Sequence, residues 1–298
     1  MLDGEQFTAA ALCIGGTAFA ASAQSWFPLL FTHGGDAGLE GYVQMADNAK
    51  LADENEHYRL SVESVLFDES AGTGVISLHL ENKQQDGVKP FTLAHLLDSY
   101  RNKPDMTWTT LSSCYAEEGQ LAFEVMYGDS GFCGSEFYLD TARSTDNDYY
   151  FEGAFAISGD YQKGEPLRLE ALDPSGTTVR AGTAKTVLAV DLPEFQQMPY
   201  LTSADGDVTL SQIGIRIRNA DMHCTVDEVD KLSVQLRDGS EYVILDENAD
   251  IDRTLYTYGF NSTEDTDRID TEIAVLARAF DLDNVQSVTI NGEVYPLS

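Results

Sequence analysis

The chain has 298 residues, 50 of them acidic and 18 basic, which gives a formal net charge of −32. This charge argues against binding to nucleic acid or to anionic lipid, because both require a basic surface. The hydrophobic fraction of 43% is typical of globular proteins, so we expect a folded chain with a sizeable core. At about 150 residues per domain, the length predicts two domains.

An apolar run of small residues spans residues 8–21. It is shorter than the roughly 20 residues that cross a membrane. The Ala-Ser-Ala sequence at residues 21–23 fits a signal-peptide cleavage site, but the residues before the run include acidic and no basic side chains, unlike a signal peptide. Two interpretations remain: the outer half of a membrane helix whose cytoplasmic part is missing from this chain, or an Ala-rich element that packs on the body. We favour the first, with residues 1–51 as a juxtamembrane segment.

From residue 57 onward the sequence is typical of β-structure, with partial apolar alternation and many β-branched residues. A surface helix is expected at 39–51, and a short helix at 92–99, after Pro90. We expect residues 52–195 to form a first β-sandwich domain. Its strands are predicted at Tyr58–Leu66, Val75–Leu80, Leu121–Tyr127, Tyr149–Ile157, Leu167–Leu172 and Val187–Val190.

Residues 193–200 contain two prolines and no periodicity, so they are the expected linker. Beyond them, Asp238-Gly239 and Asn291-Gly292 are dipeptides that favour type I′ hairpins, in which both central residues have positive φ. The predicted fold is all-β: tandem immunoglobulin-like β-sandwich domains at 52–195 and 200–298, with a short N-terminal helical segment. The strands of the second domain are predicted at Val208–Leu210, Ile213–Ile217, Leu232–Leu236, Tyr242–Leu245, Leu255–Tyr258, Ile273–Leu276, Val285–Ile290 and Val294–Leu297.

The four cysteines, Cys13, Cys114, Cys133 and Cys224, form no CxxC pair, which argues against a structural zinc site. Cys114 and Cys133 flank a predicted strand, and two neighbouring strands could bring them within disulfide reach. Outside the cell such a bond is chemically permitted. The alternative is two buried or free thiols.

A weak calcium loop is the one cofactor site that the sequence suggests. Asp246, Asn248, Asp250 and Asp252 place oxygen ligands at relative positions 1, 3, 5 and 7, as calcium loops do. The Gly at position 6 is missing, and Thr257 stands where an acidic residue is needed. A solvated acidic turn is the alternative interpretation.

The sequence predicts that the chain is not an enzyme. Gly128-Asp-Ser-Gly131 is the tetrapeptide that surrounds a chymotrypsin-like nucleophile, but Phe132 follows it, and His95 is too close upstream for the spacing of those proteases. A Gly-rich hairpin turn explains the tetrapeptide better. His79 alternates within a predicted strand, which favours an ordinary sheet position over a catalytic one. The sequence also lacks the glycine-rich motifs of nucleotide-binding proteins.

Four stretches resemble a known family. Residues 61–69, 208–217, 232–240 and 281–297 resemble strands and hairpins of an extracytoplasmic domain of unknown function. That domain lies outside the single membrane helix of anti-sigma-factor-like proteins of Gram-positive bacteria. The resemblance implies a tandem β-sandwich, a membrane tether and a place outside the cell, and it implies no catalytic residues.

The expected function is therefore the extracytoplasmic sensory or interaction region of a membrane-anchored, anti-sigma-factor-like regulator. Its partner would be an envelope ligand or protein that the sequence does not name, and its contact with the membrane would be only through the N-terminal anchor. The alternative is a cell-surface adhesion or carbohydrate-binding module that uses loops at one end of a sandwich.

Overall fold

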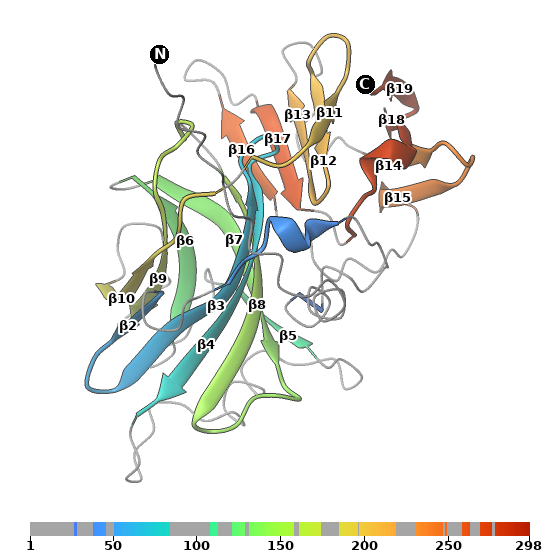
Figure 1. Ribbon diagram of the computed structural model, residues 1–298. Coiled ribbons are helices and arrows are strands. Elements are labelled where there is room, and N and C mark those ends of the chain that lie inside the picture. The colour runs from blue at the N-terminus through green and yellow to red at the C-terminus, as the bar shows by residue number, and fades with distance from the viewer. Residues whose placement is uncertain are drawn as a thin grey trace, which may run out of the picture.

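Figure 1 shows the computed structural model of the chain. The structure describes residues 27–28, 38–45, 51–83, 108–112, 121–128, 131–157, 161–173, 185–195, 197–218, 230–246, 248, 258–262, 269–275 and 278–298. These ranges are nearly all β with antiparallel pairing, which confirms the all-β prediction. Their helical content is limited to two 3-10 turns, Leu39–Gly41 (η1) and Leu282–Asn284 (η4). No helix within the described ranges has the length and apolarity to span a membrane.

The first sheet has ten strands in the order β1-β3-β4-β8-β7-β6-β9-β10, with β2 paired to β3 and β5 to β7. In β3, the buried Leu60 and Val62 alternate with half-buried residues, the period-two pattern of a strand with one face inward. The strands are β1 Gln44–Met45, β2 Ala52–Glu54, β3 Tyr58–Asp68, β4 Thr73–Asn82, β5 Trp108–Ser112, β6 Ala122–Tyr127, β7 Gly131–Asp140, β8 Asp148–Ile157, β9 Leu167–Asp173 and β10 Lys185–Asp191.

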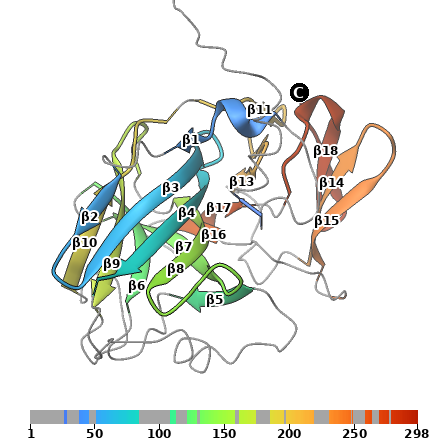
Figure 2. The same cartoon turned by 60° about the horizontal axis from the view of Figure 1, so that its bottom comes forward.

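The first sheet curls around one apolar core, so that its last strand, β10, returns to the side of β2 (Figures 1 and 2). The backbone N–H of Ala189 on β10 donates to Oδ2 of Asp53 on β2 at 2.9 Å. Aromatic rings fill the enclosed core, where Phe123 packs against Phe137 and Phe151 at centroid distances of 5.5 and 5.1 Å. The curl lets one sheet supply several sides of its own core.

Residues 200–298 contribute two smaller antiparallel sheets, of five and four strands. Both sheets place side chains in one apolar cluster, including Leu210 and Ile215 from the first and Val234 and Val288 from the second. The five-stranded sheet has the order β11-β12-β13-β17-β16, with β11 Tyr200–Thr202, β12 Val208–Ser211, β13 Gly214–Arg218, β16 Tyr258–Ser262 and β17 Ile269–Val275. The four-stranded sheet has the order β15-β14-β18-β19, with β14 Lys231–Leu236, β15 Glu241–Asp246, β18 Val285–Ile290 and β19 Glu293–Pro296.

The two predicted type I′ turns have different outcomes. Between β18 and β19, Asn291 and Gly292 have φ of 49° and 88°, so both central residues are left-handed as predicted. Between β14 and β15, Gly239 has φ of 89° but Asp238 does not have positive φ, so the type I′ prediction is wrong there. Instead, Oδ1 of Asp238 accepts hydrogen bonds from the backbone N–H and the hydroxyl of Ser240 at 2.8 and 2.6 Å. This local capping selects a different turn.

The segment before β2 also differs from the prediction. The expected helix at 39–51 is wrong at Gln44–Met45, which forms β1 and pairs with Val65 and Ser64 of β3. The edge of the first sheet satisfies these backbone groups, and a local helix propensity cannot anticipate that partner. Residues 1–26 and the helix expected at 92–99 lie outside the described residues.

A third apolar cluster joins the first sheet to the C-terminal region. On the first sheet, Leu66 and Val75 belong to this cluster, together with Met198, Ile213 and Ala279 from the later part of the chain. Met198 lies in the segment expected to be a linker, and it is buried. Met198 therefore packs into the junction between the sheets, while its neighbours Gln197 and Tyr200 are exposed and line the cleft described below.

Candidate functional site

Cys133, one half of the predicted disulfide, lies on β7 as a buried thiol. Burial raises the pKa of this thiol, so the nucleophilic thiolate is disfavoured in the folded chain. Cys114 lies outside the described residues, so the disulfide stays a prediction.

The tetrapeptide at residues 128–131 connects β6 to β7. Tyr127 pairs with Gly131, and Gly128 has φ of 54°, so the hairpin-turn interpretation is confirmed. Ser130 lies outside the described residues.

The predicted calcium loop begins at the end of β15. Oδ1 of Asp246 accepts a hydrogen bond from the backbone N–H of Asn248 at 2.9 Å, as in an Asx turn. Asp250 and Asp252 lie outside the described residues, so the calcium site also stays a prediction. Within the ranges that the structure describes, no group of three or more His, Cys, Asp or Glu side chains could hold a metal ion.

His79 belongs to a polar ladder on the face of the first sheet that is turned away from its core. Its Nε2 lies 2.8 Å from Oδ1 of Asp148, and its ring stacks on Tyr150 with a centroid distance of 4.4 Å. On the other side of Tyr150, the guanidinium of Arg143 lies 4.0 Å from the ring centroid and 3.3 Å from Oε2 of Glu63. Cross-strand pairs of this kind stabilise a sheet, which agrees with an ordinary sheet position for His79.

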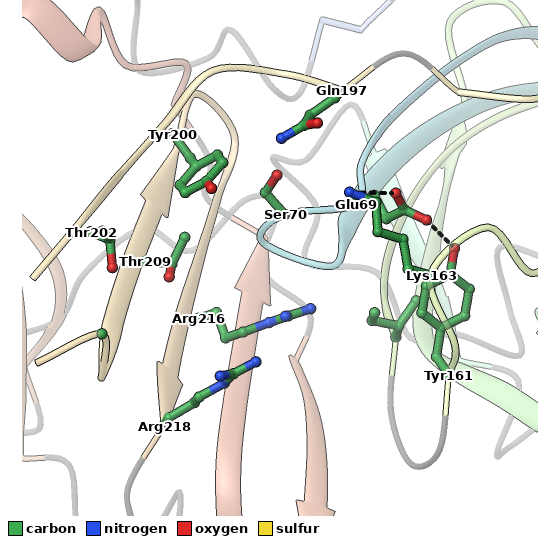
Figure 3. Close-up of a pocket in the computed structure, with 12 residues that line it drawn as sticks. Glu69, Ser70, Tyr161, Lys163, Gln197, Tyr200, Thr202, Thr209, Arg216 and Arg218 are labelled. Carbon is green, nitrogen blue, oxygen red and sulfur yellow. Dashed lines mark hydrogen bonds and ion pairs between the residues drawn. The ribbon is translucent and has the colours of Figure 1, made fainter.

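A cleft of about 440 Å³ lies between the first sheet and the β11–β13 strands (Figure 3). One wall consists of Glu69 and Ser70, in the turn after β3, together with Ile157, Tyr161 and Lys163. The opposite wall consists of Thr209 on β12 and of Arg216 and Arg218 on β13. Gln197, Tyr200 and Thr202 line a third side. The walls therefore come from segments far apart in the sequence.

Glu69, in the turn after β3, is held firmly on the first wall. Its Oε1 accepts hydrogen bonds from the hydroxyl of Tyr161 at 3.1 Å and from the backbone N–H of Gly164 at 2.6 Å. Its Oε2 lies 3.7 Å from Nζ of Lys163. Burial and the nearby Glu69 carboxylate raise the pKa of Tyr161, so its hydroxyl remains a hydrogen-bond donor.

Strand β13 turns two arginines toward the cleft. Its two isoleucines belong to the C-terminal core, so Arg216 and Arg218, at the alternate positions, lie on the opposite face. Figure 3 shows both guanidinium groups pointing away from β13 into the space before the first wall. Burial lowers the pKa of Arg216, and the positive charge of Arg218 lowers it further. Nε of Arg216 is buried without a hydrogen-bond partner among the described residues.

Two glycines allow close contact beneath the cleft. Gly72 has φ of 72°, and a β-carbon there would lie 2.7 Å from Nη2 of Arg216. Gly214 lies against the side chain of Thr73, with no room for a β-carbon between them. Asp68 beside them is fully buried, and burial raises its pKa although the charge of Arg216 opposes that shift. The close contact between the walls therefore depends on the absence of a side chain at these two glycines.

The sequence predictions of site residues include no residue of this cleft. The available signal was the stretch Gly214-Ile-Arg-Ile-Arg218, which places two basic residues on one face of a strand in a very acidic chain. No protein-family model matches the chain, and no curated protein matches it. The resemblance to an anti-sigma-factor-like extracytoplasmic domain therefore stays a prediction.

Proposed function

We propose that this chain is a non-enzymatic, extracytoplasmic sensory or interaction region of a membrane-anchored, anti-sigma-factor-like regulator. The observation that carries the proposal is the cleft, whose walls come from the first sheet and from β12 and β13. A ligand in this cleft would contact both walls and would favour the arrangement in which they lie closest. Differential binding to two arrangements is the physical requirement for a sensor.

Residues that precede the first sheet lie next to this junction. Phe27 and Leu39 are buried in the same apolar cluster as Met198 and Ile213. A movement of the cleft wall would therefore reach the segment that, in this proposal, leads to the membrane anchor. Close-packed cores transmit such movements because they contain little free volume.

The location is tested in intact host cells that produce the full protein with a C-terminal tag. Protease added outside the cells should remove the tag without lysis. A tag that is protected until the cells are lysed would overturn the extracytoplasmic placement.

The regulatory role is tested by transcription profiles of a gene deletion complemented with variants. Thr209 lines the cleft, so Thr209→Trp should fill it and alter the transcriptional response. The control is Gln286→Trp, at an exposed position on β18, which should behave as the wild type. A deletion that leaves transcription unchanged would overturn the regulator proposal.

The second candidate function is a cell-surface adhesion or carbohydrate-binding module. It is favoured by the uncharged part of the lining, which includes the hydroxyls of Thr202 and Thr209 and the ring of Tyr200, 45% exposed. A glycan array and the transcription profile of the deletion, taken together, discriminate between the two. Saturable sugar binding that Tyr200→Ala abolishes, combined with unchanged transcription in the deletion, would favour the module.

We further propose the finer architecture, with a juxtamembrane segment at 1–51, a first sandwich domain at 52–195 and an immunoglobulin-like sandwich at 200–298. Two separate apolar clusters, one in each of the later ranges, support this division. Limited proteolysis of the full chain should leave two resistant fragments that meet near residues 195–200. Early cleavage within either range, with no such fragments, would contradict it.

A further inference from the structure

The cleft has the opposite charge to the chain that surrounds it. The whole chain has 50 acidic and 18 basic residues. The cleft lining nevertheless includes three cations, Lys163, Arg216 and Arg218, against one carboxylate, Glu69. This positive charge is a local feature, and it is concentrated in a concave site where it acts most strongly on an entering anion.

The two arginines are close together, and no carboxylate forms an ion pair with either of them among the described residues. They lie two positions apart on the same face of β13, and the charge of Arg218 disfavours the charged form of Arg216. Two like charges held side by side, one of them largely buried, cost free energy that an anion between them would offset.

The nearest carboxyl groups have other partners. Glu69 accepts hydrogen bonds from Tyr161 and Gly164 and lies beside Lys163. Asp68 is fully buried, and its Oδ1 accepts a hydrogen bond from the backbone N–H of Ser70 at 2.9 Å. Its Oδ2 is buried without a hydrogen-bond partner among the described residues, so it does not bind the Arg216 donors either. These acids contribute to the field at Arg216, but their oxygens do not occupy its donors.

The rest of the lining is uncharged and suited to hydroxyl groups. It includes Ser70, Gln197, Tyr200, Thr202 and Thr209, which supply hydroxyls, an amide and an aromatic ring. The volume of about 440 Å³ is within the range of about 300–1,000 Å³ that small-molecule sites occupy. A bare ion would fill only a small part of this volume and would contact little of this lining.

We infer that the cleft binds an oxyanion group, either a phosphate or a carboxylate, carried by a small hydroxyl-rich molecule of the sugar class. Arg216 and Arg218 bind the oxyanion through their N–H donors, and the hydroxyl and amide side chains of the opposite end bind the sugar hydroxyls. This rests on the proposed function and names the ligand class of the same cleft. Guanidinium pairs are well suited to phosphate and carboxylate, because their planar N–H donors match the oxygen geometry.

The test is isothermal titration calorimetry of the purified chain with glucose 6-phosphate, glucuronate, glucose and inorganic phosphate. We expect saturable one-to-one binding of at least one of the two charged sugars, at least about tenfold tighter than glucose and than inorganic phosphate. The two charged sugars distinguish a phosphate source from a carboxylate source.

Two variants, Arg218→Gln and Lys231→Gln, each remove one positive charge. Comparing them shows whether binding depends on the cleft itself or only on the overall charge of the protein. Arg218 is exposed, so Arg218→Gln should keep the fold, and it should weaken binding of the charged sugar by about tenfold or more. Lys231→Gln is the control, because Lys231 does not line the cleft. It should bind as the wild type does, and melting curves verify that both variants are folded.

Three results would overturn the inference: no binding of either charged sugar, equal binding of glucose, or equal loss of affinity in Arg218→Gln and Lys231→Gln. Failure of the proposed function is a separate result. A chain that binds the charged sugar in solution but is protected from external protease in cells would keep this inference and overturn the extracytoplasmic role.

Discussion

Gly214 on β13 lies so close to the side chain of Thr73 on β4 that no β-carbon fits between them. Oγ1 of Thr73 is buried and has no hydrogen-bond partner among the described residues, so the contact depends on shape. It joins the first sheet to the C-terminal region directly beneath the cleft. The position of the arginine pair relative to the first wall therefore depends on this contact.

We expect Gly214→Ala to lower the free energy of unfolding by about 1–3 kcal/mol, because the added methyl group overpacks the contact. Thr73→Ala makes room for it, so the double variant should be more stable than the sum of the two single effects predicts. Urea-induced unfolding of the four proteins measures this coupling.

The control for this cycle is Gly41→Ala, since a β-carbon at Gly41 meets nothing within 4 Å. Its stability should change by less than about 0.5 kcal/mol. Additive effects of Gly214→Ala and Thr73→Ala on the free energy of unfolding would contradict this prediction. They would show that the methyl group added at position 214 and the side chain of Thr73 do not occupy the same space.

Asp68 should make stability depend on pH. Burial raises its pKa in the folded chain, so the folded state binds its proton at a higher pH than the unfolded state does. The stability contribution of Asp68 therefore rises as pH falls through the folded-state pKa, and the gain ends below the unfolded-state pKa of about 3.9. As pH falls from 7 to 4, we expect the free energy of unfolding of the wild type to increase relative to that of Asp68→Asn. Parallel curves for the two proteins would contradict this assignment.

Cys133 should be unreactive in the native chain, because its thiol is buried and its raised pKa disfavours the thiolate. Mass spectrometry after iodoacetamide treatment should find it unmodified in native protein and modified in urea with reductant. Denatured protein without reductant tests the predicted disulfide to Cys114, because a bonded cysteine stays unmodified there. Rapid alkylation of native Cys133 would contradict its burial.

The calcium prediction is tested by melting temperature. A bound ion raises the melting temperature in millimolar calcium relative to chelator, and Asp246→Ala should remove that rise. Asp246 also accepts a turn hydrogen bond, so the control is Asp238→Ala, which removes a comparable turn hydrogen bond outside the loop. Equal melting temperatures of the wild type in calcium and in chelator would exclude the site.

Local sequence patterns predicted the β-structure well where the residues of the pattern are themselves the physical cause of the structure. Alternating residues such as Leu60 and Val62 make a strand with one buried face, and Asn291-Gly292 makes a left-handed turn because both residues tolerate positive φ. The pattern was insufficient at Gln44–Met45, where the edge of β3 supplies the partner, and at Asp238, where a side-chain hydrogen bond selects the turn.

The sequence by itself determined an acidic, folded, all-β chain, because charge and period-two alternation are properties of neighbouring residues. It also carries arginines at two alternate positions, 216 and 218, although the predicted strand ends at Ile217 and the structure extends it to Arg218. Only the tertiary structure decided which segment the arginine-bearing face of β13 lies against. The sequence separation between β13 and Glu69 is long, and no local rule states that Gly214 and Gly72 let the two walls approach. The cleft therefore results from long-range packing.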